Sequence, residues 1–448
     1  GWFPAAAFAV IAVLSVTLLV SAAVSKRDGR ILATVLPIGV AAVSGMVGYV
    51  VAWLLSDVFV VFGVGLGSRV MSWVAAGFAI AGFAIVHIVL SRGMMRVAAA
   101  ILTVFAILAA AIGIDQSYGE YATIGSLFGE DSYSQADLTG LAKRKDLITV
   151  AQWRKQAANG TIRNIPANGT VNKIDIPATK SQFEARKALV YLPPAALADS
   201  KRKPALPVVL MLSGQPGSPG RVFQAGGIQT MMDGYAKTHD GLAPIVIAAD
   251  QLGADSHNTL CVDSKVYGNA LTYLTQDVVD WVKTNLPAAQ DAKDWAIAGF
   301  SQGATCSLQI GVNHPDLFGT MIPTDSEIKP TNGSRQEMID RFFDGDTTAY
   351  ENQVPVNAIR NHAPTHQMLI IGAGEKDTTS IRNVKTIAPV AAKAGMRVAA
   401  VESSGNAHDW HAVQDVLRYG LAVFGHDTGL DGANPNLSDY PNLKRITI

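Results

Sequence analysis

Residues 295–303 read WAIAGFSQG, and this stretch decides the fold of the larger part of the chain. Its first four residues are apolar and predict a buried strand, and a helix is expected to begin near Gly303. Between them lies a G-x-S-x-G motif with Ser301 at its centre. Small residues beside the serine permit a sharp turn that lifts the hydroxyl above a sheet. The context therefore predicts a nucleophile at Ser301.

Strands and helices alternate on both sides of this motif. Short apolar runs predict further strands at residues 188–192, 207–212, 245–249, 319–322, 368–371 and 397–401. Helices are expected between them, notably at residues 270–284, 303–312 and 384–394. This alternation predicts the α/β class, with a doubly wound, mostly parallel sheet that helices cover on both faces.

A serine hydroxyl is a weak nucleophile, so a base and an orienting acid must accompany it. In this architecture they follow the serine in the order acid, then histidine. Asp377 lies just past the strand at 368–371 and is the first choice for the acid, with Glu375 as the second. His408 follows the strand at 397–401 after a short glycine-containing loop and is the predicted base.

The negative charge that develops on an ester oxygen requires two backbone N–H donors. Gln302, directly after the nucleophile, should supply one of them. The other should come from the loop after the strand at 207–212, where Gln215 is favoured because Pro216 has no N–H. The segment 331–356 between two predicted strands is also long enough to form a lid.

Cys261 and Cys306 are the two cysteines, and both are expected near the same edge of the sheet as Ser301. In a domain outside the cytoplasm this placement predicts a disulfide that braces the site. The chain has no CxxC or HExxH spacing, so neither a metal nor a cofactor is expected. The formal net charge of zero does not suggest a nucleic-acid partner.

The first 114 residues differ sharply from the rest, because they carry eight of the 72 charged side chains. Four uncharged stretches, residues 2–25, 31–56, 70–91 and 97–114, are each long enough to span a bilayer. The two connections at 25–30 and 91–96 are rich in Lys and Arg, which places that side in the cytoplasm. The residues after 115 then face outward.

The predicted organisation therefore has four parts. Residues 1–114 form a bundle of four transmembrane helices, and residues 115–145 form a linker. Residues 146–425 form an extracytoplasmic α/β domain, and residues 426–448, rich in Asn, Asp, Gly and Pro, form a C-terminal tail.

Three segments carry a resemblance to a known family: residues 207–217 (PVVLMLSGQPG), 299–303 (GFSQG) and 405–410 (GNAHDW). They resemble the esterase branch of the α/β-hydrolase fold, which includes esterase D-like enzymes, feruloyl esterases and actinobacterial mycolyltransferases. The resemblance covers roughly residues 185–425. It implies Ser301 as nucleophile, Asp377 as acid and His408 as base. The helices before such a domain resemble membrane-bound esterases of actinobacterial envelopes, some of which act on aminoacylated or acylated lipids.

The main hypothesis is a membrane-anchored extracytoplasmic serine esterase whose partner is a lipid or lipid-like ester at the outer leaflet. It would hydrolyse an ester of an envelope lipid or glycolipid through an acyl-enzyme on Ser301. One alternative is an acyltransferase that uses the same three residues and passes the acyl group to an alcohol. Another is a catalytically silent membrane-bound binding protein, which the Ser–acid–His order disfavours.

Overall fold

The computed structural model describes residues 2–24, 30–59, 65–121, 125, 133–141, 146–162, 164–200 and 202–448. The chain divides into two compact units, with the boundary between Gly119 and Glu120. The sequence predicted a boundary near residue 114. The difference arises because the last helix of the first unit continues through Asp115 to Tyr118.

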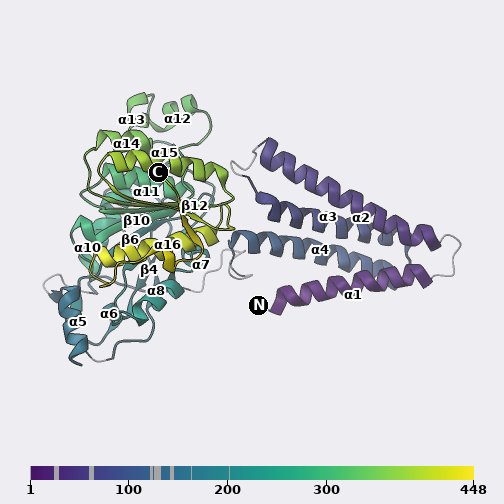
Figure 1. Ribbon diagram of the computed structural model, residues 1–448, viewed down its shortest axis with the longest axis horizontal. Helices are drawn as coiled ribbons and strands as arrows, with labels where there is room; N and C mark the ends of the chain where they lie inside the picture. The colour runs from purple at the N-terminus through teal and green to yellow at the C-terminus, as the bar shows by residue number, and fades with distance from the viewer. Residues whose placement is uncertain are drawn as a thin grey trace. The chain divides into compact units, whose positions relative to one another are not determined.

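The first unit is helical (Figure 1). Its helices are α1 (Trp2–Val24), α2 (Arg30–Trp53) with a π-helical turn at Leu54–Val58, α3 (Gly67–Leu90) and α4 (Met94–Tyr118). Helices α3 and α4 approach closely at Gly113, where a Cβ atom would lie 2.2 Å from the ring of Trp73. Close approach at small residues is typical of helices that pack in a bilayer. All four helices are long and apolar enough to cross a membrane, which matches the four predicted spans.

The second unit is built on a mixed ten-stranded sheet in the described part of the chain. The strands in spatial order are β1 (Ser134–Gln135), β3 (Thr170–Ile174), β4 (Ala188–Leu192), β7 (Ile245–Ala248), β6 (Val208–Leu212), β10 (Trp295–Phe300), β11 (Thr320–Thr324), β12 (Met368–Gly374), β13 (Arg397–Ser403) and β14 (Leu443–Arg445). The six strands from β7 to β13 run parallel, whereas β4 and β14 pair antiparallel with their neighbours.

Helices cover both faces of this sheet (Figure 1). The side chains of β6 alternate between the two buried clusters that these helices complete. Val208, Leu210 and Leu212 belong to one buried cluster, together with side chains of α10 (Val278–Asn285), α11 (Gln302–Asn313) and α15 (Thr378–Lys393). Val209 and Met211 belong to the other, with α7 (Pro219–Ala225), α8 (Ile228–Lys237) and α16 (Trp410–Asp427). Successive residues of a strand point to opposite faces. The predicted α/β class and doubly wound sheet are confirmed.

The remaining elements are short and lie between these layers or around them. They are α5 (Val150–Ala158), α6 (Pro194–Leu197), α9 (Ala270–Thr272), the π-helical turn Tyr273–Asp277, the 3₁₀ turns Ala292–Asp294 and Leu437–Asp439, α12 (Arg335–Phe342), α13 (Thr347–Glu351), α14 (Pro355–Asn361), the paired β2 (Leu147–Ile148) and β5 (Lys203–Pro204), and the hairpin of β8 (Asp263–Ser264) and β9 (Gly268–Asn269).

Both ends of the second unit differ from the prediction. Residues 426–448 are not a free tail, because α16 continues to Asp427 and β14 pairs with β13 at the edge of the sheet. The predicted linker at 115–145 contains β1, which pairs with β3. The strands β1 and β14 are short and mostly polar, so they lack the apolar pattern by which strands are found. Residues 122–124, 126–132 and 142–145 of that linker lie outside the described part of the chain.

Candidate active site

Ser301 occupies a sharp turn between β10 and α11. Its backbone has φ 56° and ψ −117°, a conformation that L side chains rarely adopt. The two glycines of the motif permit this turn. A Cβ atom on Gly299 would lie 2.2 Å from the Gly303 carbonyl oxygen, and one on Gly303 would lie 2.3 Å from the Ser213 carbonyl oxygen. The Ser301 N–H donates to Thr324 O at 3.0 Å, which fixes the turn to β11.

Ser301, His408 and Asp377 form one hydrogen-bonded series. Ser301 Oγ lies 2.9 Å from His408 Nε2, and His408 Nδ1 lies 2.7 Å from Asp377 Oδ2. The other Asp377 oxygen accepts the Ser380 N–H at 3.0 Å, so the acid also caps α15. The ring of Phe300 packs 4.9 Å from the imidazole. The carboxylate and the phenyl ring together leave the imidazole little freedom to rotate.

The charges of the series favour a basic imidazole. Burial alone would lower the pKa of His408, but the hydrogen bond to Asp377 and the nearby carboxylates outweigh burial and raise that pKa above its ordinary value. Burial opposes ionisation of Asp377 as well, yet hydrogen bonds from His408 and Ser380 hold the pKa of Asp377 below its ordinary value. Asp377 is therefore a carboxylate at neutral pH, beside an imidazole that accepts protons readily.

Glu375, the second choice for the acid, lies away from His408. Its Oε2 accepts the Gly405 N–H at 2.7 Å, and its Oε1 lies 3.0 Å from Lys444 Nζ. These bonds fix the loop that carries His408 to the loop after β12. Of the two acids that the sequence left open, the structure brings Asp377 to the imidazole.

The two predicted oxyanion donors lie on either side of the turn. Gln302 is the first residue of α11, where a backbone N–H has no acceptor within its own helix. The loop that carries Gln215 also approaches the serine, because a Cβ atom on Gly214 would lie 3.6 Å from Ser301 Cβ. Within the described ranges, neither the Gln215 N–H nor the Gln302 N–H donates a hydrogen bond. Both donors are therefore available to a bound oxyanion.

A buried amide ties these two donors together. Gln251, which follows β7, is fully buried. Its Nε2 donates to Ser213 O at 2.7 Å and to the side-chain oxygen of Gln302 at 3.2 Å. Ser213 precedes the loop of Gln215, so one side chain bridges both halves of the expected oxyanion hole. Gln251 was not predicted, since a lone glutamine after a strand carries no distinctive signal.

The predicted disulfide between Cys261 and Cys306 is present, with the two Cα atoms 5.7 Å apart. It joins the loop after β7 to α11, one turn beyond Ser301. Gln302 Nε2 lies 3.2 Å from Cys306 Sγ, so the bridge packs directly against the side chain that follows the nucleophile. The disulfide therefore braces the helix on which the turn depends.

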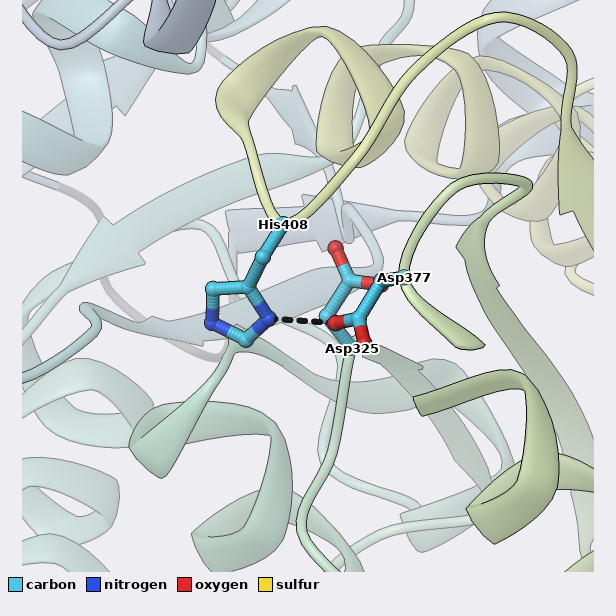
Figure 2. A group of neighbouring side chains, drawn as sticks. All are labelled: Asp325, Asp377 and His408. Carbon is cyan, nitrogen blue, oxygen red and sulfur yellow. Dashed lines mark hydrogen bonds and ion pairs between the residues drawn. The ribbon is translucent and has the colours of Figure 1, made fainter. Parts of the chain in front are cut away.

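Two more acids near the imidazole were not predicted. Figure 2 shows the carboxyl groups of Asp325 and Asp377 on the same side of the His408 ring, and their ligand atoms all lie within 4.8 Å of one another. Such a group could hold a metal ion, but both ring nitrogens of His408 already form hydrogen bonds to Ser301 and Asp377. The hydrogen bonds of His408 to Ser301 and Asp377 fit transfer of the serine proton to the imidazole. Asp325 directly follows β11, and that position was the signal available in the sequence.

Glu327 is the second of these acids and lies two residues further along. Burial raises the pKa of Glu327 to about 7, although nearby His408 and a hydrogen bond with Thr331 oppose the rise. The following segment, residues 331–356, contains α12 and α13. It packs its own apolar cluster against Leu260 and Val262. The suggestion that this segment is a lid stays a prediction.

Comparisons with known proteins find one matching family and several similar proteins. The Esterase family model, described as "Putative esterase", matches residues 180–420. An uncharacterised protein of Corynebacterium glutamicum is 32% identical over 333 residues, which cover 72% of this chain and 74% of that protein. Among solved structures, an S-formylglutathione hydrolase from Agrobacterium tumefaciens is similar at 16% identity and a TM-score of 0.48, over 59% of this chain and 98% of that one. A ferulic acid esterase from Anaeromyces mucronatus is similar at 18% identity and a TM-score of 0.43, over 58% of this chain and 91% of that one.

Proposed function

This chain belongs to the esterase family and is a carboxylic ester hydrolase, and on that premise we propose that it is a membrane-anchored, extracytoplasmic serine esterase. It hydrolyses an ester of an envelope lipid or glycolipid, such as an aminoacylated or acylated lipid, through an acyl-enzyme on Ser301. The observation that carries the proposal is the hydrogen-bonded series from Ser301 Oγ through His408 to Asp377, at 2.9 and 2.7 Å.

The first half of the reaction acylates Ser301. His408 Nε2 takes the hydroxyl proton as Oγ attacks the ester carbonyl carbon, and the carbonyl electron pair moves to its oxygen. The N–H groups of Gln215 and Gln302 stabilise that oxyanion, helped by the positive end of the α11 dipole. When the tetrahedral intermediate collapses, the bond to the alcohol oxygen breaks. His408 gives its proton to this leaving oxygen, while Asp377 holds the ring.

The second half releases the acyl group. A water molecule in the place of the departed alcohol gives a proton to His408 and attacks the acyl carbon, and Ser301 recovers its proton as the acid leaves. If an alcohol takes the place of water, the same steps transfer the acyl group to it. Hydrolase and acyltransferase therefore differ in the second acceptor, and the products distinguish them.

Three observations support the placement at the outer face of a membrane. Helices α1 to α4 are long and apolar enough to span a bilayer. Lys and Arg concentrate in the connections at 25–30 and 91–96, which by the positive-inside rule assigns residues after 118 to the opposite side. The Cys261–Cys306 bridge fits an oxidising compartment. A substrate at the outer leaflet would then be near the membrane segment that precedes the catalytic unit.

Labelling with a fluorophosphonate tests the nucleophile. The full chain in detergent is compared with Ser301→Ala and with a matched control, Ser307→Ala. Ser307 lies on the same helix, and its hydroxyl donates to Ala304 O at 2.8 Å. We expect labelling of the wild type and of Ser307→Ala, and none of Ser301→Ala. Labelling that persists in Ser301→Ala would refute the role of Ser301.

Two further measurements test substrate and orientation. Incubation with extracted envelope lipids should release a free acid in the wild type and none in Ser301→Ala, and mass spectrometry identifies the lipid consumed. A transferred acyl group on an added alcohol, with no free acid, would identify an acyltransferase instead. Alkaline phosphatase fused after residue 448 should be active, because that reporter works outside the cytoplasm. An inactive fusion would overturn the orientation.

A further inference from the structure

Asp325 is a fully buried acid with one unsatisfied oxygen. It follows β11 in the left-handed backbone region, with φ 54°, and it is 0% exposed. Its Oδ1 accepts the Gly374 N–H at 2.9 Å. Its Oδ2 has no hydrogen-bond partner in the described part of the chain. A buried polar atom without a partner costs free energy, so this oxygen requires an explanation beyond support of the β12 backbone.

The topology explains why two acids meet beside one imidazole. Asp325 and Asp377 follow β11 and β12, which are adjacent parallel strands, so both lie at the same edge of the sheet. One carboxyl oxygen of each acid and one ring nitrogen of His408 lie within 4.8 Å of one another. Figure 2 shows Asp325 beside Asp377 and facing the same imidazole. Asp325 therefore stands within reach of the ring that Asp377 holds.

The surroundings of the two acids favour ionisation of Asp377 over ionisation of Asp325. Burial raises the pKa of Asp325 well above its ordinary value; the charge of His408 opposes this rise, whereas the charges of Asp377 and Asp409 add to it. The pKa of Asp377 is lowered. Asp377 therefore ionises more readily than Asp325, as expected for two carboxyl groups that share a site. Removal of Asp377 would remove one of the charges that keep Asp325 neutral.

We propose that Asp325 is a second positioning residue for His408, which orients the imidazole in place of Asp377 when that carboxylate is absent. The proposal rests on the proposed serine-esterase function. With Asp377 present, Asp325 contributes little. Without Asp377, it ionises next to His408 and supplies the carboxylate that the imidazole needs. The other charged groups that face this site are Glu327, past the end of β11, and Asp409, at the start of α16.

A double-mutant cycle tests this role. The full chain in detergent is prepared as wild type, Asp325→Asn, Asp377→Ala and the double variant, and kcat and KM are measured for p-nitrophenyl butyrate. The amide oxygen that Asp325→Asn introduces would still accept the Gly374 N–H. We expect Asp325→Asn to lower kcat by about 3-fold in the wild-type background and by about 100-fold in the Asp377→Ala background, within the roughly 10⁴-fold that a triad acid can contribute. The control Ser326→Ala, at a buried neighbour of Asp325, should leave kcat unchanged in both backgrounds.

The pH profile of Asp377→Ala gives a second readout that requires no change at Asp325. If nothing replaces Asp377, the pKa of His408 falls, and the acidic limb of kcat/KM moves to lower pH than in the wild type. If Asp325 replaces it, that acid must lose its proton, and the limb stays at the wild-type pH or moves higher. The acidic limb of kcat/KM should then move to lower pH when Asp325→Asn is added to Asp377→Ala.

The outcomes separate the two proposals. An equal effect of Asp325→Asn in both backgrounds, or a limb that moves lower in Asp377→Ala, would refute the role of Asp325 and leave the esterase function intact. If Asp325→Asn fails to fold, the Asp377→Ala profile alone decides. A folded wild type that neither hydrolyses the ester nor reacts with a fluorophosphonate would instead refute the proposed function, and this role with it.

Discussion

Replacement of Gly303 by alanine tests whether the turn around Ser301 depends on close backbone packing. Gly303 lies in the first turn of α11, against the end of β6. A Cβ atom there would lie 2.3 Å from Ser213 O and 2.6 Å from Leu212 O, whereas real Cβ contacts stay beyond 3.0 Å. These neighbours are backbone atoms and have no rotamer to change. The start of α11 must therefore move away from β6 by at least 0.7 Å.

The cost of this movement can be worked out. Overpacking of this kind costs about 3 kcal/mol, and alanine returns about 1 kcal/mol of helix propensity. The net loss of unfolding free energy is about 2 kcal/mol. For a unit of the length of residues 120–448, this corresponds to a fall in Tm of about 3 °C. Because the shift displaces Ser301 relative to His408, the rate of fluorophosphonate labelling should fall on the order of 100-fold.

Differential scanning calorimetry and labelling kinetics measure both effects on the full chain in detergent. The matched control is Gly234→Ala in α8, where nothing lies within 4 Å of the added Cβ. That variant should gain up to about 1 kcal/mol in free energy of unfolding and react with the fluorophosphonate at the wild-type rate. If Gly303→Ala matched Gly234→Ala in Tm and in labelling rate, the close contact between α11 and β6 would not control the nucleophile.

Three other predictions follow from the charges and cross-links. Esterase activity should be lost as pH falls through the pKa of His408, because the protonated ring cannot act as a base; since that pKa is raised, the midpoint of kcat/KM should lie above the ordinary value of about 6.5. Replacement of Cys261 and Cys306 together by alanine should lower the free energy of unfolding by about 4 kcal/mol, measured by urea denaturation, because the bridge closes a loop of 45 residues. Asp250→Asn should cost about 3 kcal/mol in the same assay, because it removes the charge of a fully buried carboxylate that pairs with the partly buried Arg186. Asp344→Asn, at the exposed pair with Lys265, should stay within about 0.5 kcal/mol.

The central part of the sheet could be predicted from the sequence because its strands are buried on both faces. Such strands are continuous apolar runs, and all seven that were predicted are present, at β4, β6, β7 and β10 to β13. The edge strands β1 and β14, and β3 next to β1, could not be found in this way. Residues 443–445, for example, read LKR, and two of the three are exposed. Their place in the sheet depends on backbone hydrogen bonds, which leave no apolar pattern.

The site could be predicted where chain order and local chemistry determine it. Ser301, Asp377 and His408 each follow a recognisable strand, so their approach follows from the topology. The choice between Asp377 and Glu375 could not be made in this way, because it depends on which side chain α15 and β14 leave facing the imidazole. Asp325 was also missed, since its importance lies in burial, which a single sequence does not reveal.

The order of the site residues along the chain also determines when the enzyme can first act. Ser301 precedes His408 by 107 residues, and synthesis at about 5–20 residues per second separates the two by roughly 5–20 s. The four apolar helices precede both residues in the chain, so the nascent chain carries an inert serine hydroxyl until well after these helices have been made. The strand that closes the sheet beyond His408, β14, comes later still. Ester hydrolysis can therefore begin only after the four apolar helices have been made.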